Sequence, residues 1–246
     1  MQEDAFSVWL QKEPLGQYLL AKEQAFYDQV CSDIFGLYAL QAGLPSIPFL
    51  QNSRIGTQIK MGSSGGNLQA HADALPLDWR SVDLVLLPHT LELSNHPHKT
   101  LNEVRRVLVP DGKVIITGFN PASLWGYKKQ LHPNLPYRKQ MVGIWRLKDW
   151  LKLLDFEIIS GQFMAYAPPF NHTQRLQKCQ FLEDAGNRWW PHLAAVYAIV
   201  AVKRVYNVTP LVPEWKSEKL KLSPILGNSQ PENKTLVDKK DSSQLN

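Results

Sequence analysis

Three residues that could take part in ligand binding or catalysis each stand at the end of an apolar run that is typical of a buried strand. Gly43, His89 and Asn120 close the runs GLYALQAG, VDLVLLPH and KVIITGFN. In an open α/β sheet, ligands bind beside the carboxyl ends of the strands. A glycine there lets the backbone approach a ligand closely, and a histidine has a pKa range suited to acid–base chemistry. Gly43 can equally serve as a turn glycine, so both interpretations stay open.

The elements that would position these residues alternate between strands and helices. Strands are expected at Leu37–Gln41, Val82–Leu87, Val114–Gly118, Glu157–Gln162 and Ala195–Val202, and TQIKMG (57–62) and LQAHAD (68–73) are candidate short strands. Helical periodicity covers residues 17–35, 97–109 and 145–154. This alternation predicts a mostly parallel sheet with helices on both faces.

The composition is typical of a soluble globular protein, and 246 residues suffice for one domain of ordinary size. Residues from Glu214 onward lack an apolar pattern, so we expect a domain over residues 1–212 and a disordered tail over residues 213–246. The N-terminal MQEDAF is unlike a secretory signal, and no apolar stretch is long enough to span a bilayer. We therefore expect a cytoplasmic protein.

The sequence offers little support for a metal site or a nucleic-acid site. The two cysteines, Cys31 and Cys179, cannot form a four-thiolate zinc site, and His96 and His98 have no thiolate pair nearby. The formal net charge is +5, but the basic residues form scattered pairs such as Arg105–Arg106 instead of one dense patch. We expect no metal, and nucleic-acid binding is the weaker interpretation of the charge.

Three blocks together carry a resemblance to a known family. They are DALPL (73–77), VDLVLLPHTLEL (82–93) and NEVRRVLVPDGKVIITGFNP (102–121). In order and spacing they resemble the central half of the type 11 class I S-adenosylmethionine (AdoMet)-dependent methyltransferases. PLGQYLL (14–20) and GNRWWPHLAAVY (186–197) are similar to a little-characterised bacterial subgroup of that family. The resemblance implies a Rossmann-like α/β fold of the seven-stranded type, with an antiparallel last strand and a shortened first half.

The resemblance also implies which residues line an AdoMet pocket. The implied set follows the strand ends and comprises Gly43, Asp73, Ala74, Leu75, Pro88, His89 and Thr90. In the family, the aspartate matched by Asp73 contacts the adenine amino group, and Leu75 would pack on the ring. The alternative for Asp73 is a helix or turn cap. His89 would form a pocket wall, or less plausibly a catalytic base, because methyl transfer often needs only positioning.

A second set of residues falls where a methyl acceptor would enter. It comprises Asn120, at the end of its strand, and the aromatic residues Trp125, Tyr127, Tyr166, Phe170, Trp189 and Trp190. Such aromatic side chains can bind a flat or apolar acceptor. The alternative is a cap that packs only on itself.

The chain departs from the family where the methionine and ribose moieties of AdoMet would bind. The family's Gly-x-Gly-x-Gly loop corresponds to QAGLPSI, in which only Gly43 matches. The family's acidic residue at the end of the second strand is replaced by Lys60, Met61 and Gly62. We therefore expect weak AdoMet binding unless Gln41, Asn52 or the Pro-rich loop supplies replacement contacts.

Three functions follow from these observations. The first is AdoMet-dependent methyl transfer to an unidentified acceptor, for which we expect a small molecule. The second is a non-catalytic protein of the same fold that serves as a ligand sensor or interaction module. The third is RNA binding or modification. The sequence sets neither the acceptor nor the oligomeric state, because one fold hosts many functions.

Overall fold

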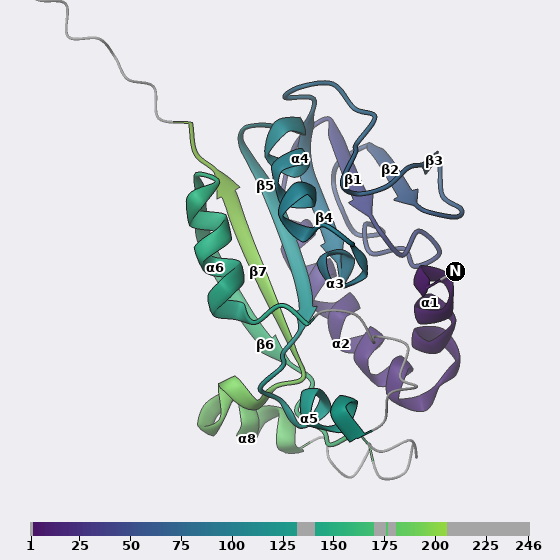
Figure 1. Ribbon diagram of the computed structural model, residues 1–246, viewed down its shortest axis with the longest axis vertical. Helices are drawn as coiled ribbons and strands as arrows, with labels where there is room; N and C mark the ends of the chain where they lie inside the picture. Colours follow the sequence, from purple (N-terminus) through teal and green to yellow (C-terminus); the bar gives the residue numbers. More distant parts are fainter. Residues whose placement is uncertain (1, 132–140, 170–175, 177–180, 206–246) are drawn as a thin grey trace, which may run out of the picture. The chain divides into compact units, whose positions relative to one another are not determined.

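The computed structural model describes residues 2–131, 141–169, 176 and 181–205 (Figure 1). Its strands are β1 Tyr38–Ala42, β2 Thr57–Gly62, β3 Leu68–Gln69, β4 Val82–Pro88, β5 Leu108–Phe119, β6 Phe156–Met164 and β7 Val196–Lys203. They form one seven-stranded sheet in the order β3-β2-β1-β4-β5-β7-β6. Neighbours from β3 to β5 are parallel, and β7 is antiparallel to both β5 and β6. The predicted sheet, with its antiparallel last strand, is confirmed.

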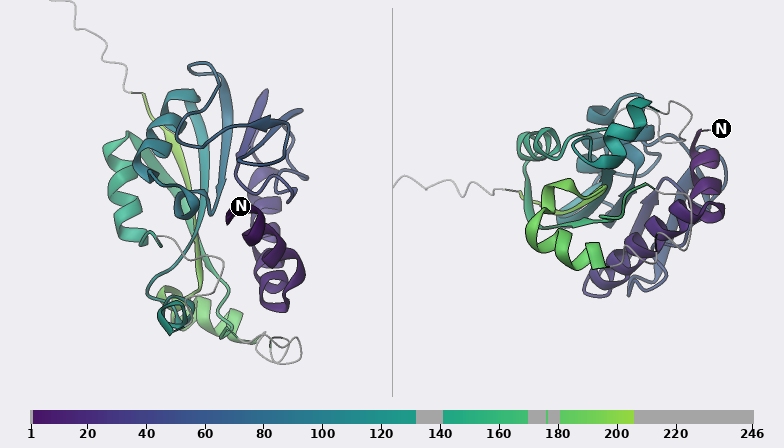
Figure 2. Two further views of the ribbon diagram at one scale, coloured as in Figure 1. Left: turned by 45° about the vertical axis from the view of Figure 1, so that its right-hand side comes forward. Right: turned by 90° about the horizontal axis from the view of Figure 1, so that it is seen from below.

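Helices cover both faces of this sheet (Figure 2). They are α1 Gln2–Lys12, α2 Pro14–Cys31, α3 Thr90–Leu93, α4 Pro97–Val107, α5 Leu124–Leu131, α6 Ile144–Leu153 and α8 Phe181–Trp189, with a 3-10 turn, η1, at Pro191–Leu193. The strands present alternate residues to opposite faces. Leu84 and Leu86 of β4 therefore join the apolar cluster of α1 and α2, whereas Val85 and Leu87 join the cluster of α4 and α6.

The strand β4 is central, with β1 on one side and β5 on the other. Its sequence VDLVLLP is almost continuously apolar because both of its faces are buried. This position agrees with the predicted strand Val82–Leu87. The central strand ends at Pro88, so the residues that follow it are held at the middle of the carboxyl edge of the sheet.

The first half of the fold is shortened, as predicted. Within the described residues, no helix connects β1 to β2, β2 to β3 or β3 to β4. Pro45 and Pro48 disfavour a helix after β1. The loop after β1 instead buries Leu44, Phe49 and Leu50 in the cluster formed with α1 and α2. The N-terminal helices α1 and α2 thus cover the part of the sheet that a helix between β1 and β2 would otherwise cover.

Some predicted elements differ from the observed ones. The sequence did not indicate α1, whose Phe6 and Leu10 are both fully buried. The helix expected over residues 17–35 begins at Pro14 and ends at Cys31. The strand expected over residues 68–73 is only Leu68–Gln69. The sequence Pro-Asp-Gly at residues 110–112 is typical of a turn, but these residues lie within β5, where the pairing with β4 shifts register. The predicted boundary at residues 212 and 213 lies outside the described residues.

In the part of the chain that the structure describes, no helix combines the length and apolar character needed to cross a bilayer. Among the described residues, the longest helix is α2, which has 18 residues and buries Leu19, Phe26 and Tyr27.

Candidate functional site

A cavity of about 370 Å³ opens at the carboxyl edge of the sheet. It lies at the ends of β1 and β2, beside the loop after β3 and the start of α3. The chain passes from β1 outward to β2 and β3 and then returns to β4 on the other side of β1. Such a reversal of strand order is the place where open α/β sheets bind ligands. The volume falls in the range of about 300–1,000 Å³ that is usual for small-molecule sites.

The structure brings Gly43, Asp73 and Thr90 together in the wall of this cavity. These three residues come from separate predicted strand ends. Met61 and His71 also line the cavity, although the sequence did not single them out as ligand contacts. The signal that could have indicated Met61 is its place near the end of the short strand predicted at residues 57–62.

Gly43 is a position that needs glycine. Its φ is +103°, and a Cβ placed there would lie 2.7 Å from Thr90 Oγ1. Its N–H donates to Met61 O at 2.8 Å, which joins the ends of β1 and β2. The Thr90 hydroxyl in turn donates to the carbonyl oxygen of Ala42. Gly43 thus allows β1, β2 and the start of α3 to approach closely around the cavity.

Asp73 lies on the loop after β3, with its side chain partly exposed to the cavity. Its Oδ2 is 4.0 Å from Lys99 Nζ on α4, an ion pair at the limit of contact distance. The next two residues do not line the cavity. Ala74 donates its N–H to His71 O at 3.0 Å, and Leu75 is buried in the α4 side of the core, with its N–H bound to Glu103 Oε2 at 3.0 Å.

Pro88 and His89 also lie outside the cavity wall. His89 is fully buried, and its ring lies between two carboxylates: Nε2 is 2.6 Å from Glu23 Oε1, and Nδ1 is 3.0 Å from Glu92 Oε2. Burial alone lowers the pKa of an imidazole, but the charges of Glu23 and Glu92 outweigh it and raise the pKa of His89 to about 10. His89 is therefore a buried cation, and neither ring nitrogen is free to act as a base.

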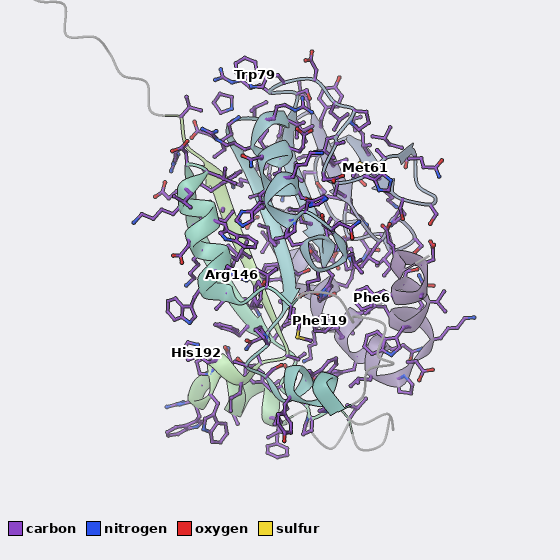
Figure 3. The ribbon with its side chains drawn as sticks, in the orientation of Figure 1. Phe6, Met61, Trp79, Phe119, Arg146 and His192 are labelled. Atoms are coloured by element: carbon purple, nitrogen blue, oxygen red, sulfur yellow. The ribbon has the colours of Figure 1, made fainter. Side chains whose placement is uncertain are left out.

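Aromatic rings enclose this charged group. Figure 3 labels two of these rings, Phe6 of α1 and Phe119 at the end of β5. Their ring centroids lie 5.2 Å and 4.4 Å from that of His89. No local sequence pattern indicates this ion pair, because Glu23 and His89 are 66 residues apart. The imidazolium joins α2 to the end of β4 and is not part of the wall of the cavity.

The residues predicted on the acceptor side are divided between structural and exposed positions. The Asn120 amide donates to His192 O at 2.7 Å and Ala194 O at 3.0 Å, so it fastens the end of β5 to η1. Trp125 is only 1% exposed, and its indole N–H donates to Ala167 O at 2.9 Å. Both side chains therefore stabilise the fold through these hydrogen bonds.

Other members of that set reach solvent. The exposed fractions are 64% for Tyr127 on α5, 69% for Trp189 on α8 and 55% for Trp190. Tyr166, which follows β6, is partly buried. Phe170 lies outside the described residues. Figure 1 places α5 and α8 at the carboxyl end of β5, as the predicted cap requires. None of the five described aromatic residues of this set, Trp125 included, lines the cavity.

No cluster of three or more potential metal ligands occurs among the described residues. The two neighbouring histidines, His96 and His98, have different environments. His96 lines the cavity, and the ring of His98 packs on that of Trp150, with the ring centroids 3.7 Å apart.

Comparison with known proteins agrees with the fold. Residues 52–116, from before β2 into β5, match the family described as a methyltransferase domain. The fold is shared with a SAM-dependent methyltransferase from Archaeoglobus fulgidus, with a TM-score of 0.58, 16% identity and coverage of 81% of this chain and 98% of that one. It is shared also with a SAM-dependent methyltransferase from Thermotoga maritima, with a TM-score of 0.58, 16% identity and coverage of 82% and 95%.

The chain belongs to the class I methyltransferases of the type 11 kind. Within that family it is similar to the uncharacterized protein YafS of Escherichia coli (strain K12). The two are 32% identical over 182 residues, which is 72% of each chain. This similarity agrees with the bacterial subgroup indicated by the sequence.

Proposed function

We propose that this protein transfers a methyl group from AdoMet to a small-molecule acceptor, with AdoMet bound in the cavity at the carboxyl edge of the sheet. The observation that carries the proposal is the meeting of Gly43, Asp73 and Thr90 in one cavity at the reversal of strand order. When bound, AdoMet would supply a methyl group that its sulfonium already activates. The protein's task is then to orient the reactants and exclude water.

The residues present fit such a ligand. Gly43 keeps a side chain away from the junction of β1, β2 and α3, where a Cβ would collide with Thr90. Asp73 offers a carboxylate that can accept a hydrogen bond from an exocyclic amine. The cavity combines these polar groups with apolar surface from Met61 and Leu93, which is the usual character of a small-molecule site.

Catalysis in this site would rest on positioning. His89 is withdrawn from the cavity, and its proton is held by Glu23 and Glu92. A base is useful but not required when the acceptor is a good nucleophile. We therefore propose an acceptor that presents its own reactive nitrogen, oxygen or sulfur without the help of His89.

RNA is less well supported as the acceptor. Several cations at the opposite edge of the sheet are already paired: Arg105 lies 2.6 Å from Asp155, and Arg204 lies 2.5 Å from Glu157. Paired cations are less available to neutralise phosphates, which dominate nucleic-acid affinity. Binding to RNA would show as an affinity that falls steeply with added salt.

Calorimetric titration of the purified protein with AdoMet and with S-adenosylhomocysteine tests the proposal. We expect saturable binding of both with dissociation constants below about 1 mM, since Michaelis constants of enzymes fall between about 1 μM and 1 mM. Absence of binding at millimolar concentrations of both would refute it and favour the non-catalytic alternative, a sensor or interaction module on the same fold.

A further inference from the structure

A carboxylate from outside the sheet lies between the ends of its first two strands. Glu3 belongs to the first turn of α1, which begins beside the carboxyl ends of β1 and β2 (Figure 1). Its Oε1 accepts the N–H of Leu44 at 2.8 Å, and its Oε2 accepts the N–H and hydroxyl of Ser63 at 3.0 Å and 2.6 Å. Leu44 follows β1 and Ser63 follows β2, so one side chain binds both loops in the wall of the cavity.

Pro45 and this carboxylate together occupy the space that a side chain at the end of β2 would otherwise enter. The last residue of β2 is Gly62. A Cβ placed on Gly62 would lie 3.2 Å from Glu3 Oε1 and 2.6 Å from Pro45 Cγ. The strand therefore ends without a side chain of its own at this point, and α1 delivers a charged group to the same place.

The carboxylate keeps capacity for a ligand. An ionised carboxylate has about four acceptor positions. Three of them are used by Leu44 and Ser63, which leaves one position on Oε1. The Ser63 hydroxyl donates to Glu3 and can still accept. Glu3 and Ser63 together can thus accept from two neighbouring hydroxyl groups, the pattern that a vicinal diol presents.

We propose that Glu3, with Ser63, binds the ribose hydroxyls of the nucleoside moiety of the ligand. The inference rests on the proposed AdoMet site and assigns one part of it. Carboxylates bind ribose hydroxyls at the same edge of related nucleotide-binding sheets. Here the carboxylate comes from a helix that precedes the sheet in sequence. Glu3 and Asp73 line one cavity, so a nucleoside bound there meets a carboxylate at its sugar and another at its base.

The test uses the full chain with its affinity tag after residue 246, so that α1 is unmodified. Adenosine and 2′,3′-dideoxyadenosine are titrated into the wild-type protein, Glu3→Gln and Asp4→Asn. Asp4 is the next residue of α1, is exposed and lies outside the wall of the cavity, so its variant is a matched control for charge. AdoMet is titrated into the same three proteins, and circular dichroism with thermal melting checks their folding.

We expect the wild type and Asp4→Asn to prefer adenosine over the dideoxy analogue. Glu3→Gln should bind AdoMet about ten- to a hundred-fold more weakly and lose most of that preference, because a hydrogen bond to a charged group is lost. Ser63→Ala should shift both in the same direction by a smaller factor. This second variant keeps the test decisive if Glu3→Gln folds poorly.

Two results would overturn the inference while leaving the proposed function intact. One is a well-folded Glu3→Gln that binds AdoMet as the wild type does and keeps its preference for adenosine. The other is tighter binding by Glu3→Gln, which would identify Glu3 as an occupant that ligands must displace. A wild type that binds neither AdoMet nor adenosine would overturn the proposed function itself, and this inference with it.

Discussion

Glu23 and His89 form a buried ion pair, with Oε1 2.6 Å from Nε2, that joins α2 to the end of the central strand. The second ring nitrogen binds Glu92, so the imidazolium is shared between two carboxylates that are themselves almost fully buried. Removing one partner of a buried pair leaves a charge without compensation. The stability of this edge of the sheet should therefore depend on Glu23 and on the proton that His89 holds.

Glu23→Gln should lower the free energy of unfolding by about 3–5 kcal/mol, the usual cost of breaking a buried ion pair. Urea denaturation followed by circular dichroism measures it. Glu157→Gln is the matched control, because Glu157 forms an exposed pair with Arg204. Solvent screens such exposed pairs, so the loss of this one should change stability little. Equal effects of the two variants would contradict the buried charge at His89.

The same pair predicts a pH dependence of stability. The pKa of His89 is raised to about 10 in the folded protein from its ordinary value of 6.5. Below the ordinary value both states hold the proton, so the stabilisation is fully present. Between the two values only the folded state holds it, so stability should fall by about 1.4 kcal/mol for each pH unit. Denaturation midpoints from pH 6 to pH 10 should show this slope, and His89→Gln should flatten it.

Gly43→Ala should destabilise the fold and disturb the cavity together. The φ of +103° is unfavourable for any side chain, and the new Cβ would approach Thr90 Oγ1. We expect a loss of about 1–3 kcal/mol from backbone strain alone. Gly56→Ala is the control, because a Cβ there meets nothing within 4 Å. A Gly43→Ala protein as stable as Gly56→Ala would show that the turn relaxes without cost.

The central part of the fold was predictable because its signals are local. The runs at β4 and β5 are apolar on both faces, and the apolar positions of α4 recur at helical spacing. These patterns can be recognised in the sequence without knowing which distant residues are in contact. By contrast, α1 has only a short apolar face, in which Phe6 and Leu10 take their meaning from the sheet that they cover. Its role could not be predicted from eleven residues alone.

The candidate site was predictable only in part, for the same reason. Gly43, Asp73 and Thr90 follow strands, and the topology of a parallel sheet brings strand ends together. Glu3 and Ser63 are 60 residues apart, and no local pattern indicates their contact. His89 follows a strand as Thr90 does, yet its ring faces the buried Glu23. Strand-end position identifies the edge of the sheet, and the rotamers and distant partners decide which side chains reach the cavity.

Trp125 was predicted on the acceptor side, but the structure buries it, so its replacement should lower the stability of the fold. Trp125→Ala should cost about 3–5 kcal/mol, because a large buried side chain leaves a cavity. It also leaves Ala167 O without its indole donor. Trp145→Ala is the control, because Trp145 of α6 is 71% exposed. It should change the free energy of unfolding by about 0.5 kcal/mol or less. Thermal melting of both variants measures the difference, and similar melting temperatures would place Trp125 outside the core.

Asp73→Ala tests the base-binding end of the cavity. If Asp73 accepts a hydrogen bond from the adenine amino group, its loss should weaken AdoMet binding by about 1–3 kcal/mol. The fold should be nearly unaffected, because Asp73 lies on a loop and its contact with Lys99 is 4.0 Å long. Titration with S-adenosylhomocysteine and with its inosine analogue, which lacks the amino group, measures the effect.

The comparison of the two ligands makes this prediction specific to the amino group. The wild type should prefer the adenine compound, and Asp73→Ala should bind both compounds about equally. Asp33→Ala, at an exposed position before β1, is the control for loss of one negative charge and should keep the wild-type preference. A well-folded Asp73→Ala that retains both affinity and preference would show that Asp73 only caps its loop, and that the nucleoside base is recognised by other groups of the cavity wall, such as His71 or the backbone of the loop after β3.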